Sequence, residues 1–234
     1  MDWMLLIVNR KDVPSGETVA PAEMARYGGE LVAAGRARGD APLRTEAEGA
    51  RVRVQNGRAL VTDGPFAEAK EVVAGYFAVD AATREQAIGL ALRCPAARSS
   101  SWRVEVRAAP DRDVAGLAQG AEFMLLLHMP PELTDPDGAK YREMLAFDAE
   151  LKRAGAYVES AALPLDPKPA RVETRDGRIA VLDGPFAEAK EVCGGYYVVS
   201  APDRAAALAL AARCPHARWG DVEVRPIMSK RGRP

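Results

Sequence analysis

The sequence predicts an α+β protein in which two similar halves pack sheet to sheet within one chain. The first observation is a duplication, because residues 63–72 (DGPFAEAKEV) recur without a change as residues 183–192. The similarity extends outward in both directions, which indicates a repeated domain. The second observation is that each half contains strand-like and helix-like segments in the order β-α-(β)-β-β-β-α-β. Two helices cover one face of such a sheet, so the other faces are expected to pack against each other.

The duplication also sets the expected domain boundaries. We assign a first repeat to residues 1–108, a linker to 109–121, a second repeat to 122–228 and a basic tail to 229–234. The alternative arrangement, two independent domains on a linker, would leave two apolar sheet faces exposed to water. We therefore favour an internal pseudo-dimer, and the sequence leaves open whether two chains pair further.

The amino-acid composition indicates a soluble globular protein and argues against several other classes. Hydrophobic residues make up 48% and charged residues 28% of 234 residues, which is ordinary for a soluble globular chain. The net charge of -1 argues against nucleic-acid binding. The sequence contains neither a membrane-length apolar run nor a secretion signal, and Cys94, Cys193 and Cys214 make no disulfide or zinc pattern. We expect a cytoplasmic protein without a cofactor, a bound metal or a membrane partner.

Short apolar runs and hairpin signals predict the strands. Residues 52–61 form two strand-like runs around Asn56-Gly57, a pair that tolerates the positive φ angles of a tight hairpin turn. The second half has Asp176-Gly177 at this place, which is another favoured pair. The other predicted strands are residues 3–8, 41–45, 72–79, 102–107, 123–127, 192–199 and 222–224.

Helical spacing and capping residues predict two helices in each half. Met24, Tyr27 and Leu31 lie on one face of a helix, and the same spacing recurs 120 residues later. Thr83 begins a second helix with a capping-box pattern, and Asp203 takes its place in the second half.

The longest motifs resemble a known family. The DGPFAEAKE run precedes a strand with Tyr76 or Tyr196, an Arg-Cys-Pro triplet ends the second helix of each half, and Val-Glu-Val-Arg closes each half at 104–107 and 222–225. These features resemble the DGPF family of YCII-related proteins. The resemblance implies a ferredoxin-like fold of the dimeric α/β barrel type, with the tandem copy supplying both subunits.

The resemblance implies little about activity. Members are often encoded beside extracytoplasmic-function sigma factors, which suggests a regulatory setting with a protein partner. Distant relatives include enzymes that act on muconolactone-type compounds, for which a His–Asp pair is proposed. This sequence departs from that pattern, because its histidines are His128 and His216, and their repeat equivalents are Val8 and Ala96. A His–Asp mechanism is therefore in doubt.

Asp63 and Asp183 are the catalytic candidates. In the functional interpretation, each carboxylate lies at the mouth of a cleft between the halves and acts as an acid, a base or a ligand contact. In the structural interpretation, an Asp before Gly-Pro is a turn residue that accepts backbone N–H bonds.

Other residues near the repeated motif could bind a ligand. The candidates are Lys70, Glu71, Tyr76, His128, Lys190, Glu191 and Tyr196. The lysines and glutamates would form a polar cluster beside each aspartate, or else lie on a solvated loop. The tyrosines would point into the interface as donors, or else be ordinary buried aromatics. Strand alternation could turn His128 toward a cavity, although a core or edge histidine is the simpler interpretation.

Two classes of function remain open. The first is a protein that binds or transforms a small polar molecule in a cleft between the repeats. The second is a regulatory module without catalysis that binds a protein partner in a sigma-factor pathway. We favour the first because ferredoxin-like dimers commonly leave a cleft, an analogy at the level of the fold. The sequence decides neither the substrate nor whether the protein is an enzyme.

Overall fold

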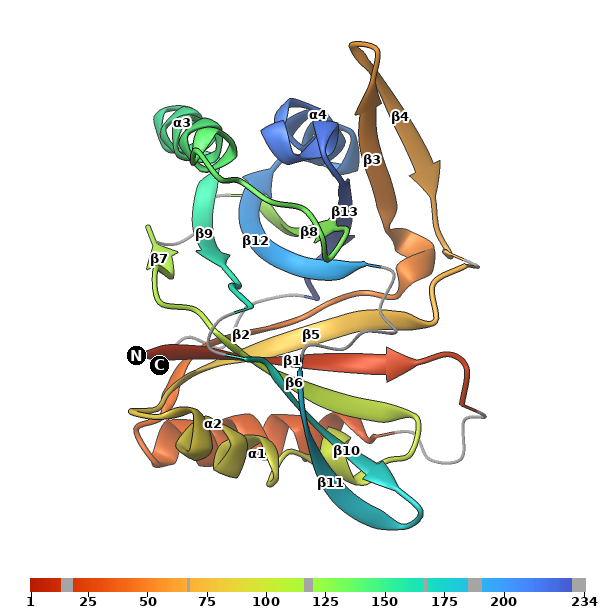
Figure 1. Ribbon diagram of the computed structural model, residues 1–234, viewed down its shortest axis with the longest axis vertical. Helices are drawn as coiled ribbons and strands as arrows, with labels where there is room; N and C mark the ends of the chain where they lie inside the picture. Colours follow the sequence, from red (N-terminus) through yellow and green to blue (C-terminus); the bar gives the residue numbers. More distant parts are fainter. Residues whose placement is uncertain (14–18, 67, 116–119, 166–167, 185–190, 229–234) are drawn as a thin grey trace.

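A computed structural model describes residues 1–13, 19–66, 68–115, 120–165, 168–184 and 191–228. Within these ranges the protein is α+β, with two antiparallel sheets and four α-helices, as the sequence predicts (Figure 1). None of the helices in the described ranges is long and apolar enough to cross a membrane.

The two repeats contain the same elements in the same order. The first consists of β1 (Asp2–Arg10), α1 (Pro21–Ala33), β2 (Ala37–Pro42), β3 (Ala50–Gln55), β4 (Arg58–Asp63), β5 (Glu71–Asp80), α2 (Arg84–Ala91) and β6 (Trp102–Ala108). The second consists of β8 (Ala121–Met129), α3 (Ala139–Arg153), β9 (Tyr157–Ala162), β10 (Ala170–Arg175), β11 (Arg178–Asp183), β12 (Val192–Ala201), α4 (Arg204–Arg213) and β13 (Asp221–Pro226). Between them, β7 (Asp113–Val114) pairs with β9.

The turns and helix caps that the local sequence predicts are present in the structure. Asn56 and Asp176 each adopt φ 50° at the tip of a hairpin, the left-handed conformation that Asn and Asp tolerate. The Thr83 side chain accepts a hydrogen bond from Gln86 N at the start of α2, at 3.3 Å. Asp203 accepts one from Ala206 N at the start of α4, at 2.8 Å. The predicted hairpins and second helices are therefore confirmed.

The hairpins join the sheet of the opposite repeat. Sheet A has the order β11-β10-β6-β1-β5-β2, and sheet C has the order β4-β3-β13-β8-β12-β9-β7. The first-repeat hairpin β3–β4 thus extends sheet C beside β13, and the second-repeat hairpin β10–β11 extends sheet A beside β6. The expectation that each half forms a sheet of its own strands alone is wrong. Alternation along a hairpin specifies which face is buried, but it does not specify which strand edge the hairpin joins.

Three buried clusters hold these layers together. One lies between sheet A and the helices α1 and α2, and a second lies between sheet C and the helices α3 and α4. The third is built from both sheets, with Met4 and Leu6 from β1 beside Met124 and Leu126 from β8. Figure 1 shows the helix pairs on opposite outer sides of the molecule with the two sheets between them. Both faces of each central strand are therefore buried.

Two arginines fasten the sheets to each other. Arg107 of β6 and Arg225 of β13 are equivalent in the two repeats, and each is only 1% exposed. Arg107 donates to the carbonyl oxygens of Cys193, at 3.0 Å, and Leu163 in the second repeat. Arg225 donates to Val73 O in the first repeat, at 3.3 Å. Hydrogen bonds from a buried charged group are among the stronger ones, so these contacts stabilise one relative position of the sheets.

Candidate functional site

The two catalytic candidates lie on the outer surface and not in a shared cavity. Asp63 ends β4 with its side chain 73% exposed, and it pairs with Arg204 at the start of α4. Asp183 ends β11 with its side chain 68% exposed, and it pairs with Arg84 at the start of α2. Because α2 and α4 cover opposite outer faces, the structure does not bring the two aspartates together (Figure 1).

These aspartates instead connect one repeat to the other. Arg84 and Arg204 are equivalent in the two repeats, and each pairs with the aspartate of the opposite repeat. Arg204 also donates to Gly49 O at 3.2 Å, and Arg84 donates to Lys168 O at 2.8 Å. The repeated aspartate thus has an arginine partner in the opposite repeat in both copies.

The charged residues near the end of the repeated run are two lysines and two glutamates. The side chain of Lys70 is exposed, and Lys190 lies outside the described residues. Glu71 pairs with Arg103 and lies 3.7 Å from Arg171, whereas Glu191 lies 3.0 Å from Arg51. Glu71 and Glu191 therefore belong to two related ionic clusters, one on each sheet, which sequence analysis alone did not reveal.

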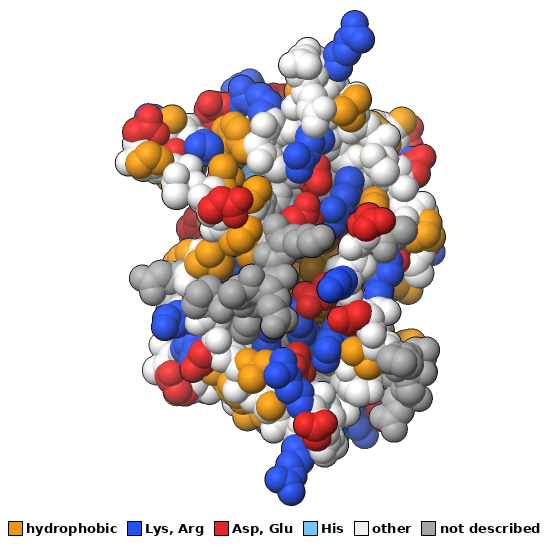
Figure 2. All heavy atoms as spheres, turned by 45° about the vertical axis from the view of Figure 1, so that its right-hand side comes forward, with side chains coloured by type: hydrophobic (Ala, Val, Ile, Leu, Met, Phe, Trp, Pro, Cys, Tyr) orange, Lys and Arg blue, Asp and Glu red, His pale blue; other side chains and the backbone are white. Residues whose placement is uncertain are grey.

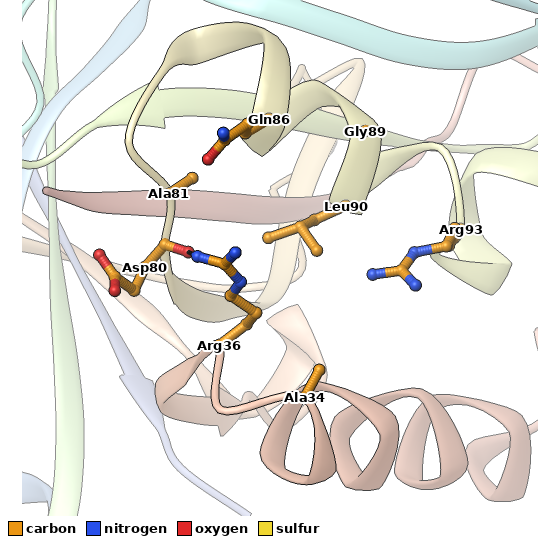
Figure 3. Close-up of a pocket in the computed structure, with 8 residues that line it drawn as sticks. All are labelled: Ala34, Arg36, Asp80, Ala81, Gln86, Gly89, Leu90 and Arg93. Carbon is orange, nitrogen blue, oxygen red and sulfur yellow. Dashed lines mark hydrogen bonds between the residues drawn. The ribbon is translucent and has the colours of Figure 1, made fainter.

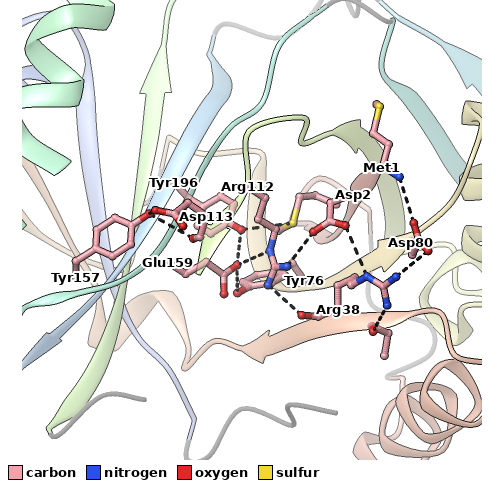
Figure 4. Close-up of polar contacts among 12 residues, drawn as sticks. Met1, Asp2, Arg38, Tyr76, Asp80, Arg112, Asp113, Tyr157, Glu159 and Tyr196 are labelled. Carbon is pink, nitrogen blue, oxygen red and sulfur yellow. Dashed lines mark hydrogen bonds and ion pairs between the residues drawn. The ribbon is translucent and has the colours of Figure 1, made fainter. Parts of the chain in front are cut away.

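The two candidate tyrosines meet at the centre of the molecule. The rings of Tyr76 and Tyr196 lie 5.4 Å apart between the sheets. Both hydroxyls donate to Oε1 of Glu159, from Tyr76 at 3.0 Å and from Tyr196 at 2.5 Å (Figure 4). Burial raises the pKa of Tyr196 well above its ordinary value, and the neighbouring Tyr76 and Glu159 raise it further. Tyr196 is therefore a protonated donor at neutral pH.

Arg112 from the predicted linker completes this central group. Its Nε lies 2.9 Å from Oε1 of Glu159, and it also pairs with Asp2 at 3.0 Å. Burial lowers the pKa of Arg112, but the Glu159 carboxylate more than compensates, so the net shift is upward. Glu159 is 1% exposed, so this buried carboxylate is fully compensated by donors. Tyr76, Tyr196 and Arg112 therefore each have Glu159 as a partner in this network.

A second polar group lies at the end of β8 and is partly exposed. We call it the His128 cluster, and it consists of Arg51, His128, Glu191, Asp221 and Glu223. Nε2 of His128 lies 3.1 Å from Oε2 of Glu223, and Arg51 Nε lies 3.5 Å from the same oxygen. Arg51 Nη1 reaches Glu191 at 3.0 Å and Asp221 at 3.8 Å. This cluster contains two of the predicted ligand-binding residues, His128 and Glu191.

The carboxylate in this cluster orients the imidazole. Burial raises the pKa of Glu223, but hydrogen bonds from His128 and Arg225 and their charges lower it more, to about 2. Glu223 is thus ionised at neutral pH and accepts the Nε2 proton of His128. Nδ1 has no hydrogen-bond partner among the described residues, and the side chain is 13% exposed. With Nε2 held by Glu223, Nδ1 is the ring nitrogen of His128 that is open to a ligand.

The equivalent place in sheet A lacks this chemistry. Val8 occupies the position of His128, and it is 4% exposed in the core between the sheets. The neighbouring ionic groups persist there, with Arg171 Nε 3.4 Å from Glu105 Oε2. Only one of the two related clusters therefore carries an imidazole.

The three cysteines are buried or partly buried thiols. Burial raises the pKa of Cys94 and Cys193 to about 11 and that of Cys214 to about 12, so all three are protonated at neutral pH. Within the described ranges, no group of three or more His, Cys, Asp or Glu side chains is arranged to hold a metal ion.

One open pocket lies beside the end of α1. It has a volume of about 410 Å³ and lies between the end of α1 and α2, where Arg36, Asp80, Gln86, Leu90 and Arg93 line it (Figure 3). None of the candidate residues from the sequence lines it. It therefore does not support the predicted cleft between the repeats.

Comparison with known proteins identifies the repeated unit. A family model of the YCII-related domain matches the chain twice, at residues 1–108 and 121–231. A search of curated proteins finds no match. The two matches agree with the duplication seen in the sequence.

Neutralising the aspartates should have little effect on stability. We expect Asp63→Asn and Asp183→Asn each to change the free energy of unfolding by less than about 1 kcal/mol, because exposed ion pairs contribute little. Urea denaturation of both variants measures this. A loss of about 2 kcal/mol or more would show instead that each aspartate anchors the fold.

Glu223 should make stability depend on acid pH. Its pKa is about 2 in the folded protein against an ordinary value of 4.5, so the unfolded chain binds more protons between these values. Its contribution is therefore complete above pH 4.5 and is lost as the pH falls toward 2, by up to about 3 kcal/mol.

Urea denaturation across this pH window compares the wild type with Glu223→Gln. Glu143→Gln is the control, since Glu143 is an exposed carboxylate paired with Arg218. The wild type and Glu143→Gln should lose stability more steeply than Glu223→Gln. Parallel curves for all three proteins would refute the assignment.

Proposed function

Because this chain belongs to the YCII-related family and holds two copies of its domain, we propose that the copies act as the two subunits of one ferredoxin-like pseudo-dimer. The strand orders β6-β1-β5-β2 and β13-β8-β12-β9 support this, since each is the order 4-1-3-2 of a ferredoxin-like unit once the exchanged hairpins are set aside. The buried cluster built from both sheets supports the dimer-like packing. The pseudo-dimer is of the dimeric α/β barrel type.

We propose that this protein binds a small polar molecule at the exposed side of the His128 cluster. The observation that carries the proposal is the His128–Glu223 pair, at 3.1 Å, in one repeat only. Arg51, Glu191 and Asp221 have side chains 20%, 35% and 17% exposed, so they offer both a donor and acceptors to a ligand. Figure 2 shows acidic and basic side chains side by side between the two halves on the right-hand side of the molecule.

The charges of the cluster indicate the kind of ligand. Three carboxylates lie close to Arg51, so the site is not a simple anion-binding site. A molecule with hydroxyl and carbonyl groups fits better, because it can donate to the carboxylates and accept from Arg51. Glu223 holds the His128 ring in place, and Nδ1 of that ring would accept a proton or a hydrogen bond from the molecule. If the protein is an enzyme, proton transfer is the step that this geometry supports.

Replacing His128 by the residue of the first repeat tests this proposal. We expect small hydroxy ketones and lactones, screened by thermal shift, to raise the Tm of the wild type by about 3–6 °C at ten times Kd. The same compounds should have no effect on His128→Val, which carries the valine found at position 8. Arg213→Ala is the control, since Arg213 is an exposed residue of α4 paired with Glu150. An unchanged shift in His128→Val would refute the proposal.

A second candidate function is supported by the exchanged hairpins. Strand β4 ends sheet C and is exposed along its length, with Leu60 49% and Val61 50% exposed. Strand β11 ends sheet A, with Ile179 43% and Val181 42% exposed. An exposed apolar edge strand is a template for an added strand of a partner. The protein would then be a regulatory module that binds a protein of a sigma-factor pathway.

Charged substitutions on the edge strand separate the two functions. We expect Leu60→Lys with Val61→Lys to abolish binding of an extracytoplasmic-function sigma factor from the same organism, because lysine on an edge strand opposes strand addition. Isothermal titration calorimetry measures this. His128→Val serves as the control and should bind as the wild type does. No heat of binding with the wild-type protein would refute this candidate.

A further inference from the structure

A reversed pair of charges distinguishes the two exchanged hairpins. Arg53 of β3 and Glu173 of β10 occupy the same position in the two repeats. Arg53 Nε lies 2.5 Å from Oδ1 of Asp221 on β13. Glu173 Oε2 lies 3.8 Å from Nη1 of Arg103 on β6. Arg103 and Asp221 are also equivalent, so both members of the pair have changed sign together.

The neighbouring pair of charges has not changed sign. Arg51 lies against Glu223, with Nε 3.5 Å from Oε2, and the equivalent Arg171 lies against Glu105 at 3.4 Å. Because both repeats have Arg on the hairpin and Glu on the sheet edge at this position, either hairpin would find an opposite charge on either sheet. At the position of Arg53 and Glu173, each hairpin finds an opposite charge only on the sheet of the opposite repeat.

Pairing between like repeats would bring like charges together. If the hairpin of a first repeat joined the β6 edge of another first repeat, Arg53 would face Arg103. If the hairpin of a second repeat joined another β13 edge, Glu173 would face Asp221. Arg103 and Glu173 are 4% and 1% exposed, so solvent would screen these repulsions poorly.

We propose that these four charges make the first repeat a partner for the second repeat and not for a copy of itself. The interaction surface consists of the β3–β4 hairpin on the β13 edge and the β10–β11 hairpin on the β6 edge. Its occupant is the other repeat of the same chain. Two chains are thereby prevented from pairing first repeat with first repeat and second repeat with second repeat, although the folds and most of the contacting residues would permit it.

Interchanging the hairpin charges in the full chain tests this. The inverted variant, Arg53→Glu with Glu173→Arg, has the composition of the wild type but repels within the chain and attracts between like repeats. The restored variant adds Arg103→Asp and Asp221→Arg, which recreates opposite charges within the chain. All proteins also carry Glu159→Gln. Glu159 lies between the repeats, where it contacts both Tyr76 and Tyr196. In a pair of second repeats two Glu159 carboxylates would meet, and the substitution removes that repulsion.

Each protein is refolded over a range of concentrations, and light scattering then measures the mass of the species formed. The Glu159→Gln reference should remain a monomer of 25.1 kDa. The inverted chain should form a species of twice that mass, and its monomer should melt roughly 10 °C lower. The restored chain should be monomeric and recover at least half of the lost Tm.

The restored chain keeps the test decisive if the inverted chain does not fold. An unfolded inverted chain beside a folded, monomeric restored chain also supports the proposal, because composition and net charge are the same in both. An inverted chain that folds and is monomeric at every concentration would overturn it. A restored chain that is as defective as the inverted one would also overturn it, since matching would then be irrelevant.

Discussion

The rest of the structure depends on one constraint, which is that β6 and β13 each need a strand from the opposite repeat on one side. Each of these strands pairs with its own repeat on one side and with a hairpin of the opposite repeat on the other. A buried strand must satisfy its backbone groups on both sides, so neither repeat is complete alone. Arg107 and Arg225 reinforce this, because their buried guanidinium groups donate to backbone carbonyl oxygens of the other repeat. Each half therefore completes the sheet of the other.

Local features of the fold could be predicted from the sequence, and the exchange of hairpins could not. Asn-Gly and Asp-Gly determine a tight turn through the conformations of two residues, and Thr83 caps a helix within its own first turn. The partner of a hairpin depends on contacts far away in sequence, and apolar alternation at residues such as Val52 suits any edge. The one signal available was the pair of sign changes at Arg53 and Asp221 relative to the other repeat.

The candidate site shows the same division between local and distant information. Both interpretations of Tyr76 and Tyr196 in their predicted strands placed them inside the protein, whereas their shared acceptor Glu159 carried no local signal. Arg112 lies in a stretch that looks like a linker, and its role arises only from the space between the sheets. Asp63 was a candidate because the same residue occurs in both copies. An ion pair with an arginine would keep the aspartate in both copies just as a catalytic role would, so the sequence could not distinguish the two.

Duplication within one chain makes a single central carboxylate possible. The repeat equivalent of Glu159 is Gly39, which has φ 152°, and a Cβ there would lie 2.9 Å from an Arg112 nitrogen. Glycine on one side leaves room for the Arg112 guanidinium, and glutamate on the other side neutralises it. A symmetric pair of identical subunits would have two carboxylates at this place or none. The chain therefore gains a buried, charge-balanced centre through the divergence of its two copies, and His128 in place of Val8 shows that the same freedom extends to the candidate site.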